Sequence, residues 1–500
     1  MARNAAKQYR ALPGSLPSPV GGWNTRDSLD DMPEQDAIVL DNWFPGLGKV
    51  SVRPGASQHA TGMAGTVETL AEYNAGAVRK LLAAGGGSIY DASGVGAVGA
   101  ALLSGMTSNR WQTANFSARQ FWVNGSDAPR TFDGATFALS AWTGPADPTK
   151  LINVAVFKSR LLFAETNKQG FWYPAVVGAV TGALTYFDLS LVTETGGNLL
   201  AISTIGVSEA APDDLAAFIM TTGEVLLYAG TDPGSAAAWA LVGRYRIGAP
   251  VNRRAVVRFG GDTMITTQQD HTSLNTWFAA ARNGITPPLS KISGAVIGAA
   301  GNSALFGWQS IVYPRGGKAI FNVPLAAGGF EQHVVNTVTG AWCRYAGLNA
   351  SCWGLYNDVL YFGAASGVVW KAEAATSDNG VAIACDGQQA WSDMGSPRRK
   401  RVSLARPVIE SQGAIPYSFG IGYDFEQIIV SASAGAGATG SPWDTSPWDT
   451  SPWSPETQIT QQWGVQIGSG QSVGMRLKVS ALQSVSWLRT DLRYEAGRGL

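Results

Sequence analysis

Charged side chains are scarce in this chain of 500 residues. Lysine and arginine together number 36, aspartate and glutamate together also number 36, and charged residues make up only 14% of the sequence. The formal net charge of zero argues against a strongly basic nucleic-acid-binding protein and against a polybasic membrane anchor. A chain with so little charge must rely on uncharged polar surface for solubility, or bury much of its surface in an assembly.

Cysteine and long apolar runs are scarce as well. Cys343, Cys352 and Cys385 show no CxxC spacing, so we predict reduced thiols rather than a disulfide framework or a zinc site. No run of 18 apolar residues occurs, and the first ten residues, MARNAAKQYR, contain no apolar signal region. We therefore expect no membrane span and no Sec-type signal, and a soluble protein made in a cytoplasm.

Histidine is rare, and the sequence contains no complete enzyme motif. His59, His271 and His333 are the only histidines, and none stands near acids at metal-ligand spacing. GQSVG at 470–474 fits the nucleophile elbow, but that fold requires the histidine to follow the serine, whereas all three precede Ser472. We expect no metal and no enzymatic activity. Glycosidase carboxylates have no fixed spacing in sequence, so an enzyme of that kind stays open as an alternative.

Two glycine-rich stretches fit the GxGxxG pattern of dinucleotide-binding loops. GVGAVG at 94–99 is followed by AALLSGM, and Arg119 stands about where that fold needs an acid. GAGATG at 435–440 lies in an Ala/Gly-rich linker. We interpret both stretches as flexible turns and expect no cofactor.

Glycine and aromatic residues are abundant, with 61 glycines and 18 tryptophans. This balance is typical of many short strands joined by tight turns. Apolar runs of four to eight residues recur, and paired runs joined by a Gly, Asn or Asp turn occupy 79–94, 119–134, 159–175, 215–231, 261–280 and 357–373. Their spacing of roughly 40 to 50 residues predicts an all-β chain with a β-propeller of about six blades over 46–375. A succession of β-sandwiches is the alternative.

The residues before the first hairpin read GGWNTRDSLDDMPEQDAIVLDNWFPGLGKVSVRPG at 21–55. We predict an irregular N-terminal arm over 1–45, with one short helix around Pro33 to Leu40. KVSVRPG at 49–55 predicts a strand that ends in a Pro-Gly turn. A strand in this place can close a propeller by completing its last blade.

From about residue 376 the strands become longer and alternate more regularly. They are RVSLARPVIES at 401–411, SFGIGYDFEQIIVSAS at 418–433, QITQQWGVQIGSG at 458–470 and SVGMRLKVSA at 472–481. This pattern predicts a separate C-terminal antiparallel β-sandwich-like domain over 376–500. The basic residues Arg398, Arg399, Lys400 and Arg401 precede its first strand. We interpret them as a solvated linker face, with contact to nucleic acid or an acidic partner as the alternative.

Three regions of the sequence, taken in their order along the chain, carry a resemblance to a protein family. GGWNTRD and LDNWFPGLGKVSVRPG come first, LYAGTDPGSAAAWALV and RIGAPVNRRAVVRFGGDTMITTQQD follow in mid-chain, and WLRTDLRYEAGRG comes last. Together they resemble the tail hub or nozzle proteins, also called tail stabilisation proteins, of short-tailed bacteriophages. In letters the resemblance is concentrated in 21–55 and about 225–270, and its motifs are structural rather than catalytic.

This resemblance implies a non-enzymatic β-propeller subunit in a homo-oligomeric ring, commonly a hexamer, below the portal–adaptor complex of the virion tail. The ring would be assembled in the bacterial host cytoplasm and would dock tail fibres, spikes or a plug protein. Viral DNA would pass through it without sequence-specific binding, and a near-zero net charge suits this because fixed basic contacts to phosphate add affinity. The N-terminal residues Trp23, Asp27, Asp41, Trp43 and Phe44 would form a tether that staples the propeller or reaches a neighbour.

Residues 441–453 read SPWDTSPWDTSPW. Proline in each unit rules out a central strand, and Ser-Pro and Asp-Thr favour turns that set the indoles at even intervals. Trp443, Trp448 and Trp453 would either fold back on the second domain's own sheet or form a protruding contact loop for a neighbouring subunit or tail protein. A carbohydrate or lipid platform is a third reading. We favour the contact loop.

Two other functions compete with the structural role. One is a β-propeller carbohydrate-binding (receptor-binding) tail protein, and the other is a polysaccharide-degrading enzyme. A lectin should repeat its aromatic pocket blade by blade, and the sequence contains no such regular repeat.

Overall fold

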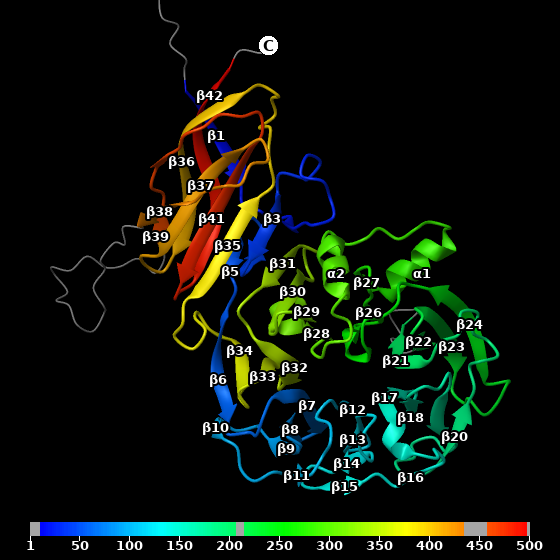
Figure 1. Cartoon of the computed structure of the whole chain (residues 1–500). Coiled ribbons are helices and arrows are strands. Elements are labelled where there is room, and N and C mark those ends of the chain that lie inside the picture. Colours follow the sequence, from blue (N-terminus) through cyan, green and yellow to red (C-terminus); the bar gives the residue numbers. More distant parts are fainter. Residues whose placement is uncertain (1–10, 207–214, 435–457, 498–500) are drawn as a thin grey trace, which may run out of the picture. The chain divides into compact units, whose positions relative to one another are not determined.

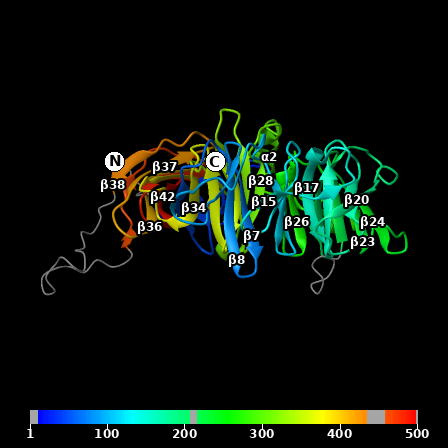
Figure 2. The same cartoon turned by 90° about the horizontal axis from the view of Figure 1, so that it is seen from below.

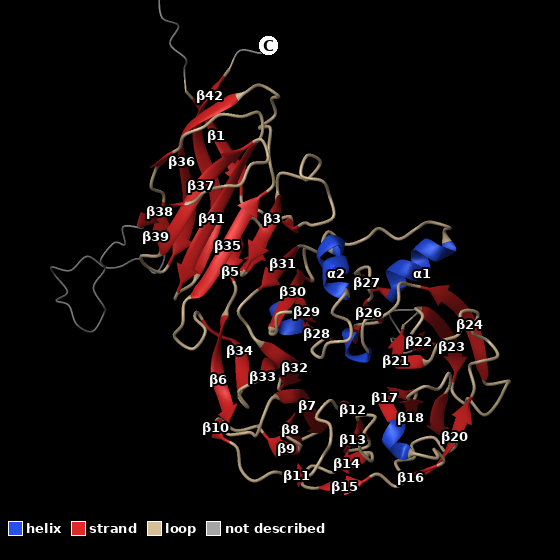
Figure 3. Cartoon of the chain, viewed as in Figure 1, coloured by secondary structure: helices blue, strands red, loops and turns tan. Residues whose placement is uncertain are grey.

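Strands dominate a computed structural model of the protein, which describes residues 11–206, 215–434 and 458–497 (Figure 3). Within those residues the α-helices are α1 (Leu274–Arg282) and α2 (Ser293–Ala300). Neither helix has the length needed to cross a membrane. The chain forms two compact units. The propeller unit comprises Ser57–His333 and Gly347–Ala372, and the sandwich unit comprises Met1–Ala56, Val334–Ala346 and Glu373–Leu500.

Six small sheets form a six-bladed β-propeller, which confirms the predicted fold (Figure 1). The first three blades contain β7 (Val67–Ala75), β8 (Val78–Gly85), β9 (Ser88–Asp91) and β11 (Leu103–Ser104); then β12 (Gln112–Phe116), β13 (Arg119–Val123), β14 (Arg130–Phe132) and β15 (Phe137–Leu139); then β16 (Trp142–Thr143), β17 (Leu151–Phe157), β18 (Arg160–Glu165), β19 (Phe171–Pro174) and β20 (Gly182–Phe187).

The last three blades follow along the chain, except for two strands of the sixth. They contain β21 (Leu199–Ile205), β22 (Leu215–Met220), β23 (Glu224–Gly230) and β24 (Trp239–Arg246); then β25 (Val256–Phe259), β26 (Asp262–Thr266) and β27 (His271–Ser273); then β32 (Ala350–Tyr356), β33 (Val359–Ala364) and β34 (Val369–Ala375) with β6 (Gly55–Thr61) and β10 (Gly96–Ala97).

The innermost strands define the centre of the ring. β7, β12, β17, β21 and β25 each pack against the next, and β28 (Gln309–Tyr313) packs between β25 and β32. β29 (Lys318–Pro324) and β30 (Phe330–Asn336) continue outward from β28. Viewed from the side in Figure 2, the strands of the propeller cross the thickness of a disc.

Turn residues and aromatic packing explain why these segments become blades. β8 and β9 are joined by Gly86 and Gly87, which both have positive φ, as a tight hairpin turn requires. Stacked rings pack between and within blades: Phe171 of the third blade lies on Phe218 of the fourth with centroids 4.5 Å apart, and Tyr228 lies on Trp239 within the fourth blade with centroids 5.3 Å apart. Burial of each such ring contributes roughly 2–3 kcal/mol. The hairpins therefore need their neighbours to be stable.

A strand from the N-terminal region completes the last blade, but it is not the predicted one. β6 pairs with β34 as the fourth strand of the blade. The predicted segment 49–55 instead forms β5 (Val50–Val52), which pairs with β4 (Trp43–Pro45) and β42 (Val485–Ala496) in the sandwich unit. The strand that closes the blade therefore begins at Gly55, where the segment that was predicted to close it ends.

The sandwich unit contains two sheets, as predicted for a sandwich-like domain. One sheet contains β1 (Leu12–Pro17), β4, β5, β36 (Lys400–Ser411), β39 (Gln458–Thr460), β40 (Gly464–Val465) and β42. The other contains β2 (Gly22–Trp23), β3 (Asp36–Asp41), β31 (Trp342–Tyr345), β35 (Ile383–Gln389), β37 (Pro416–Tyr423), β38 (Ser431–Ala434) and β41 (Val473–Ala481). Most pairs are antiparallel, whereas β3 runs parallel to β2 and β31.

The predicted N-terminal boundaries differ from this organisation. The region predicted as an irregular arm over 1–45 supplies strands β1 to β4, and it groups with 373–500 rather than standing apart. The helix expected around Pro33 to Leu40 is wrong, because Asp36–Asp41 is strand β3. Ala37 and Leu40 are fully buried there, and the pairing with β35 overrides any local helical preference.

Candidate functional site

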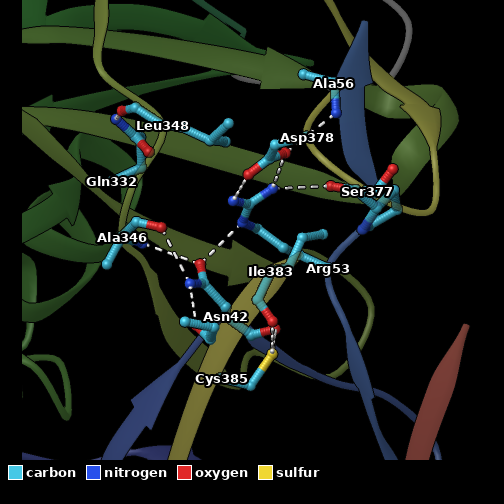
Figure 4. A network of polar contacts seen from close by, with 12 residues as sticks. Asn42, Arg53, Ala56, Gln332, Ala346, Leu348, Ser377, Asp378, Ile383 and Cys385 are labelled. Carbon is cyan, nitrogen blue, oxygen red and sulfur yellow. Dashed lines mark hydrogen bonds and ion pairs between the residues drawn. The ribbon is translucent and has the colours of Figure 1, made fainter. Parts of the chain in front are cut away.

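A buried ion pair organises the sandwich unit around Arg53, as Figure 4 shows. Arg53 Nη2 donates to Asp378 Oδ2 at 2.6 Å, Nη1 donates to Asp378 Oδ1 at 3.0 Å, and Nε donates to Asn42 Oδ1 at 2.8 Å. Asn42, at φ 60°, donates in turn to the carbonyls of Ala346 and Ala384. Every one of these groups is satisfied within the unit, so the network fixes chain segments rather than offering free chemistry.

The predicted N-terminal tether residues lie inside the sandwich unit. Trp43 is fully buried and packs on Trp487 with ring centroids 6.1 Å apart. Trp23 is buried and donates to the carbonyl of Ile38 at 3.1 Å. Phe44 follows Trp43 on β4 and is half-buried. These aromatic side chains thus anchor the N-terminal segment to the sandwich's own core, and not to the propeller as one form of the prediction had it.

The two acidic tether residues are paired within the same unit. Asp41 accepts from Arg344 Nε at 2.7 Å and from Nη2 at 2.6 Å. Asp27 accepts from Arg26 Nε and from Asn24 Nδ2. Both carboxylates therefore act as local anchors of the N-terminal strands.

The predicted basic contact divides into two parts. Arg398, Arg399 and Arg401 are exposed. Lys400 is buried, and its Nζ donates to the carbonyls of Arg398 and Gln471 at 3.0 and 2.7 Å. Burial lowers the pKa of Lys400. The cluster lies at the start of β36 within one unit, so the interpretation as a linker face between domains is wrong.

An apolar edge of the sandwich is exposed. Among the described strands, β39 and β40 pair only with β36, so they form one margin of that part of the sheet. We define the apolar edge as Ile459, Trp463, Val465 and Ile467, which are 59, 39, 77 and 93% exposed. They are spaced by two or four residues, and side chains at such even spacing lie on one side of an extended segment. Arg406 lies over the Trp463 ring at 4.5 Å.

The predicted contact loop lies next to this edge in sequence. Trp443, Trp448 and Trp453 fall in 435–457, outside the described residues, so the contact-loop reading stays a prediction. β38 ends at Ala434 and β39 begins at Gln458, so strands from the two different sheets lead into the repeat and out of it.

Two histidines that are far apart in sequence meet in the propeller unit. His271 Nε2 and His333 Nδ1 are 3.0 Å apart, and His333 Nε2 is 3.3 Å from Glu331 Oε1. Burial, followed by the neighbouring His333, lowers the pKa of His271 well below its usual value, which favours the neutral form of His271 in this contact. Within the described ranges no cluster of three or more His, Cys, Asp or Glu side chains could hold a metal ion.

The cysteines match their prediction. Cys343, Cys352 and Cys385 are buried, and no disulfide joins them. Burial raises the pKa of Cys352 to about 12, so this thiol is inert at neutral pH.

A pocket of about 260 Å³ in the propeller unit holds three arginines that sequence reasoning missed. We call it the arginine pocket, and its lining consists of Arg110, Leu200, Val251, Asn252, Arg253, Arg254, Ala304, Leu305 and Phe306. These residues lie at or just before the starts of the innermost strands β12, β21, β25 and β28, so the pocket lies at one mouth of the ring's centre.

Local structure sets the arginines in place. A single 3-10 turn, η2 (Arg253–Ala255), precedes β25, and the Asn252 side chain caps it by accepting from the Arg254 backbone N–H. Arg253 Nη2 donates to the carbonyl of Asn124 at 3.1 Å, and Arg254 Nη1 donates to the carbonyl of Glu68 at 2.7 Å. The doublet thereby ties blades one and two to the approach to β25.

A second pocket, of about 540 Å³, lies in the sandwich unit. Parts of β3, β35, β37 and β41 line it, including Asp41, Asp386 and Lys478. Asp386 accepts from Arg476 at 2.7 and 2.8 Å, so its charge is already neutralised. This pocket offers shape rather than reactive groups.

The chain shows only remote structural likeness to known proteins. No family model and no curated protein matches the chain. Among solved structures, the β-propeller domain of Cps50 (Swd1) from Myceliophteria thermophila is 12% identical, with a TM-score of 0.41, and covers 63% of this chain and 99% of its own. YCF48 bound to a D1 peptide has a TM-score of 0.41 at 8% identity, over 68% of this chain and 99% of its own. A candidate 6-phosphogluconolactonase from Bacteroides fragilis has a TM-score of 0.36 at 11% identity, over 59% and 86%.

Proposed function

We propose that the protein is a structural subunit of the tail of a short-tailed bacteriophage, the hub or nozzle. In this role copies of the chain form a homo-oligomeric ring, a hexamer by analogy, below the portal–adaptor complex. The ring extends the channel for DNA ejection and docks fibres, spikes or a plug protein. The sequence stretches at 21–55 and about 225–270 are the basis of this assignment, and a propeller combined with a sandwich is compatible with it.

The observation that carries the assembly part of the proposal is the apolar edge. Val465 and Ile467 are 77 and 93% exposed beside a sheet margin whose strands, in the part of the chain that the structure describes, pair only with β36. Sheet margins with exposed apolar side chains favour association unless charge or proline protects them. Complete burial of one such side chain contributes about 1.5–3 kcal/mol, so a few of them at each contact favour a ring strongly.

The charge balance supports a conduit for DNA. Equal numbers of acidic and basic residues give no net attraction to phosphate, whose fixed contacts would slow the passage of a duplex. The exposed Arg398, Arg399 and Arg401 would then serve a partner with an acidic surface in the tail rather than the genome.

The first experiment measures the mass of the purified chain in solution and images it by negative stain, alone and with a portal–adaptor complex. A hexamer of a 52.5 kDa chain has a mass of about 315 kDa, and an open centre wider than duplex DNA would support the conduit. A monomer that also fails to join the portal–adaptor complex would overturn the proposal. A monomer that binds or depolymerises a bacterial surface polysaccharide would favour the receptor-binding or enzymatic alternative instead.

A further inference from the structure

The arginine pocket concentrates positive charge. Arg110, Arg253 and Arg254 lie close enough for their charges to interact. The carboxylate of Glu68 forms an ion pair with Arg110, in which Arg110 Nε donates to Glu68 Oε1 at 3.1 Å. Among the described residues neither Arg253 nor Arg254 forms an ion pair, and their hydrogen bonds go to backbone carbonyls. Glu68 also acts on Arg254 through its charge. Three guanidinium groups therefore share one carboxylate, which leaves an excess of two positive charges.

Burial and electrostatic repulsion both destabilise the charged form of these arginines. Burial, followed by the charges of Arg254 and Arg110, lowers the pKa of Arg253 to about 10. Burial also lowers the pKa of Arg254. Both groups remain charged at pH 7, so the pocket holds partly desolvated like charges that repel one another. A bound anion would remove this penalty.

The rest of the lining suits an organic body attached to the anion. Phe306 lies under two of the arginines, with its ring centroid 4.3 Å from Arg110 Cζ and 5.6 Å from Arg254 Cζ. Leu200, Val251 and Leu305 add apolar surface. The volume of about 260 Å³ exceeds that of a phosphate group, which occupies about the space of two or three waters at ~30 Å³ each.

We propose that the arginine pocket binds a small phosphomonoester, with the phosphate among the three guanidinium groups and a small apolar or aromatic body against Phe306. Arginine presents paired N–H donors that match phosphate oxygens, and two unneutralised positive charges match a phosphate dianion. The site goes beyond the proposed structural role, because it lies in the propeller unit and takes a small ligand rather than another subunit.

The test is isothermal titration of the full chain with phenyl phosphate, inorganic phosphate, and benzoate as a carboxylate of similar shape. We expect a Kd for phenyl phosphate below about 1 mM, weaker binding of inorganic phosphate and still weaker binding of benzoate. Equal binding of phenyl phosphate and inorganic phosphate would mean that free phosphate is the ligand and would overturn the assigned organic body. The absence of binding by either phosphate probe would overturn the site altogether.

Variants locate the site. R253Q and R110Q should each weaken phenyl phosphate binding at least tenfold, whereas R315Q, which removes an arginine from the turn after β28, should bind as the unchanged protein does. Binding that R253Q and R110Q leave unchanged would overturn the proposal. So would displacement of phenyl phosphate by short duplex DNA at equal phosphate concentration, because that outcome marks a backbone contact. The mass measurement on the same variants is independent, so failure here leaves the ring proposal intact.

Discussion

The ion pair between Arg53 and Asp378 allows a quantitative test of how the sandwich unit is held together. The side chain of Arg53 is 1% exposed and that of Asp378 is 26% exposed. Asp378→Ala would leave a buried guanidinium without its carboxylate. Removal of one partner of a buried pair costs 3–5 kcal/mol, and the partial exposure of Asp378 places the expected loss near the lower end, at about 3 kcal/mol.

Hydrogen exchange read by mass spectrometry is the appropriate assay, because a chain with two units need not unfold in one step. A loss of about 3 kcal/mol lowers amide protection on the order of 100-fold. The decrease should appear in peptides covering β5 and β35, which flank the ion pair. Peptides from the propeller blades should change far less.

The matched control is the exposed pair between Lys49 and Glu410, whose side chains are 43 and 31% exposed. Glu410→Ala should cost less than about 1 kcal/mol. Arg53→Met combined with Asp378→Ala should cost less than the sum of the single changes, since no unpaired charge remains buried. Equal losses in D378A and E410A, or full additivity in the double variant, would refute the reasoning.

Four further predictions concern other parts of the molecule. Gly387→Ala places a Cβ 3.1–3.2 Å from atoms of the Trp43 and Trp487 rings, so it should destabilise the sandwich by about 1–3 kcal/mol in the same exchange assay. Ile467→Asp should shift the mass measured in solution toward that of the monomer, whereas the control Leu191→Asp, at a residue that is 90% exposed in the propeller unit, should not. Replacing Trp443, Trp448 and Trp453 by Ala should weaken assembly without unfolding the protein. Burial opposes the charge of Glu224, but hydrogen bonds from the Glu194 and Thr195 amides lower its pKa below 4.5. The ionised side chain therefore stabilises the fourth blade fully above pH 4.5, and this contribution is lost as the pH falls through the pKa of the folded state. Glu224→Gln should reduce the loss of amide protection that the fourth blade shows at acid pH.

The propeller was predictable because its hairpins are local. The segments 79–94 and 119–134 each contain two apolar runs and a turn, and they fold as β8–β9 and β13–β14. The hairpin predicted for 261–280 is only partly confirmed. Strands β26 and β27 form, but the residues after Ser273 form helix α1, which the Ser273 side chain caps.

The N-terminal strands and the arginine pocket depend on distant partners. Asn42 contacts Ala384, 342 positions away, and no local pattern contains that information. Arg110 and Arg254 are likewise separated by nearly half of the propeller sequence. The adjacent basic pair after an asparagine cap at 252–254 was the available signal, but a doublet of arginines is usually a solvated turn.

The pairing of β1 with β42 makes two strands far apart in the sequence mutually dependent. Leu12 lies opposite Tyr494, so the first described strand cannot find its place until the last one has been made. At 5–20 residues per second, the ribosome needs roughly half a minute to a minute and a half to deliver that partner. The propeller can fold during this interval, while the N-terminal strands wait with exposed edges. A chain that stops before β42 therefore lacks a finished sandwich, and only copies that contain β42 can present its apolar edge to a growing assembly.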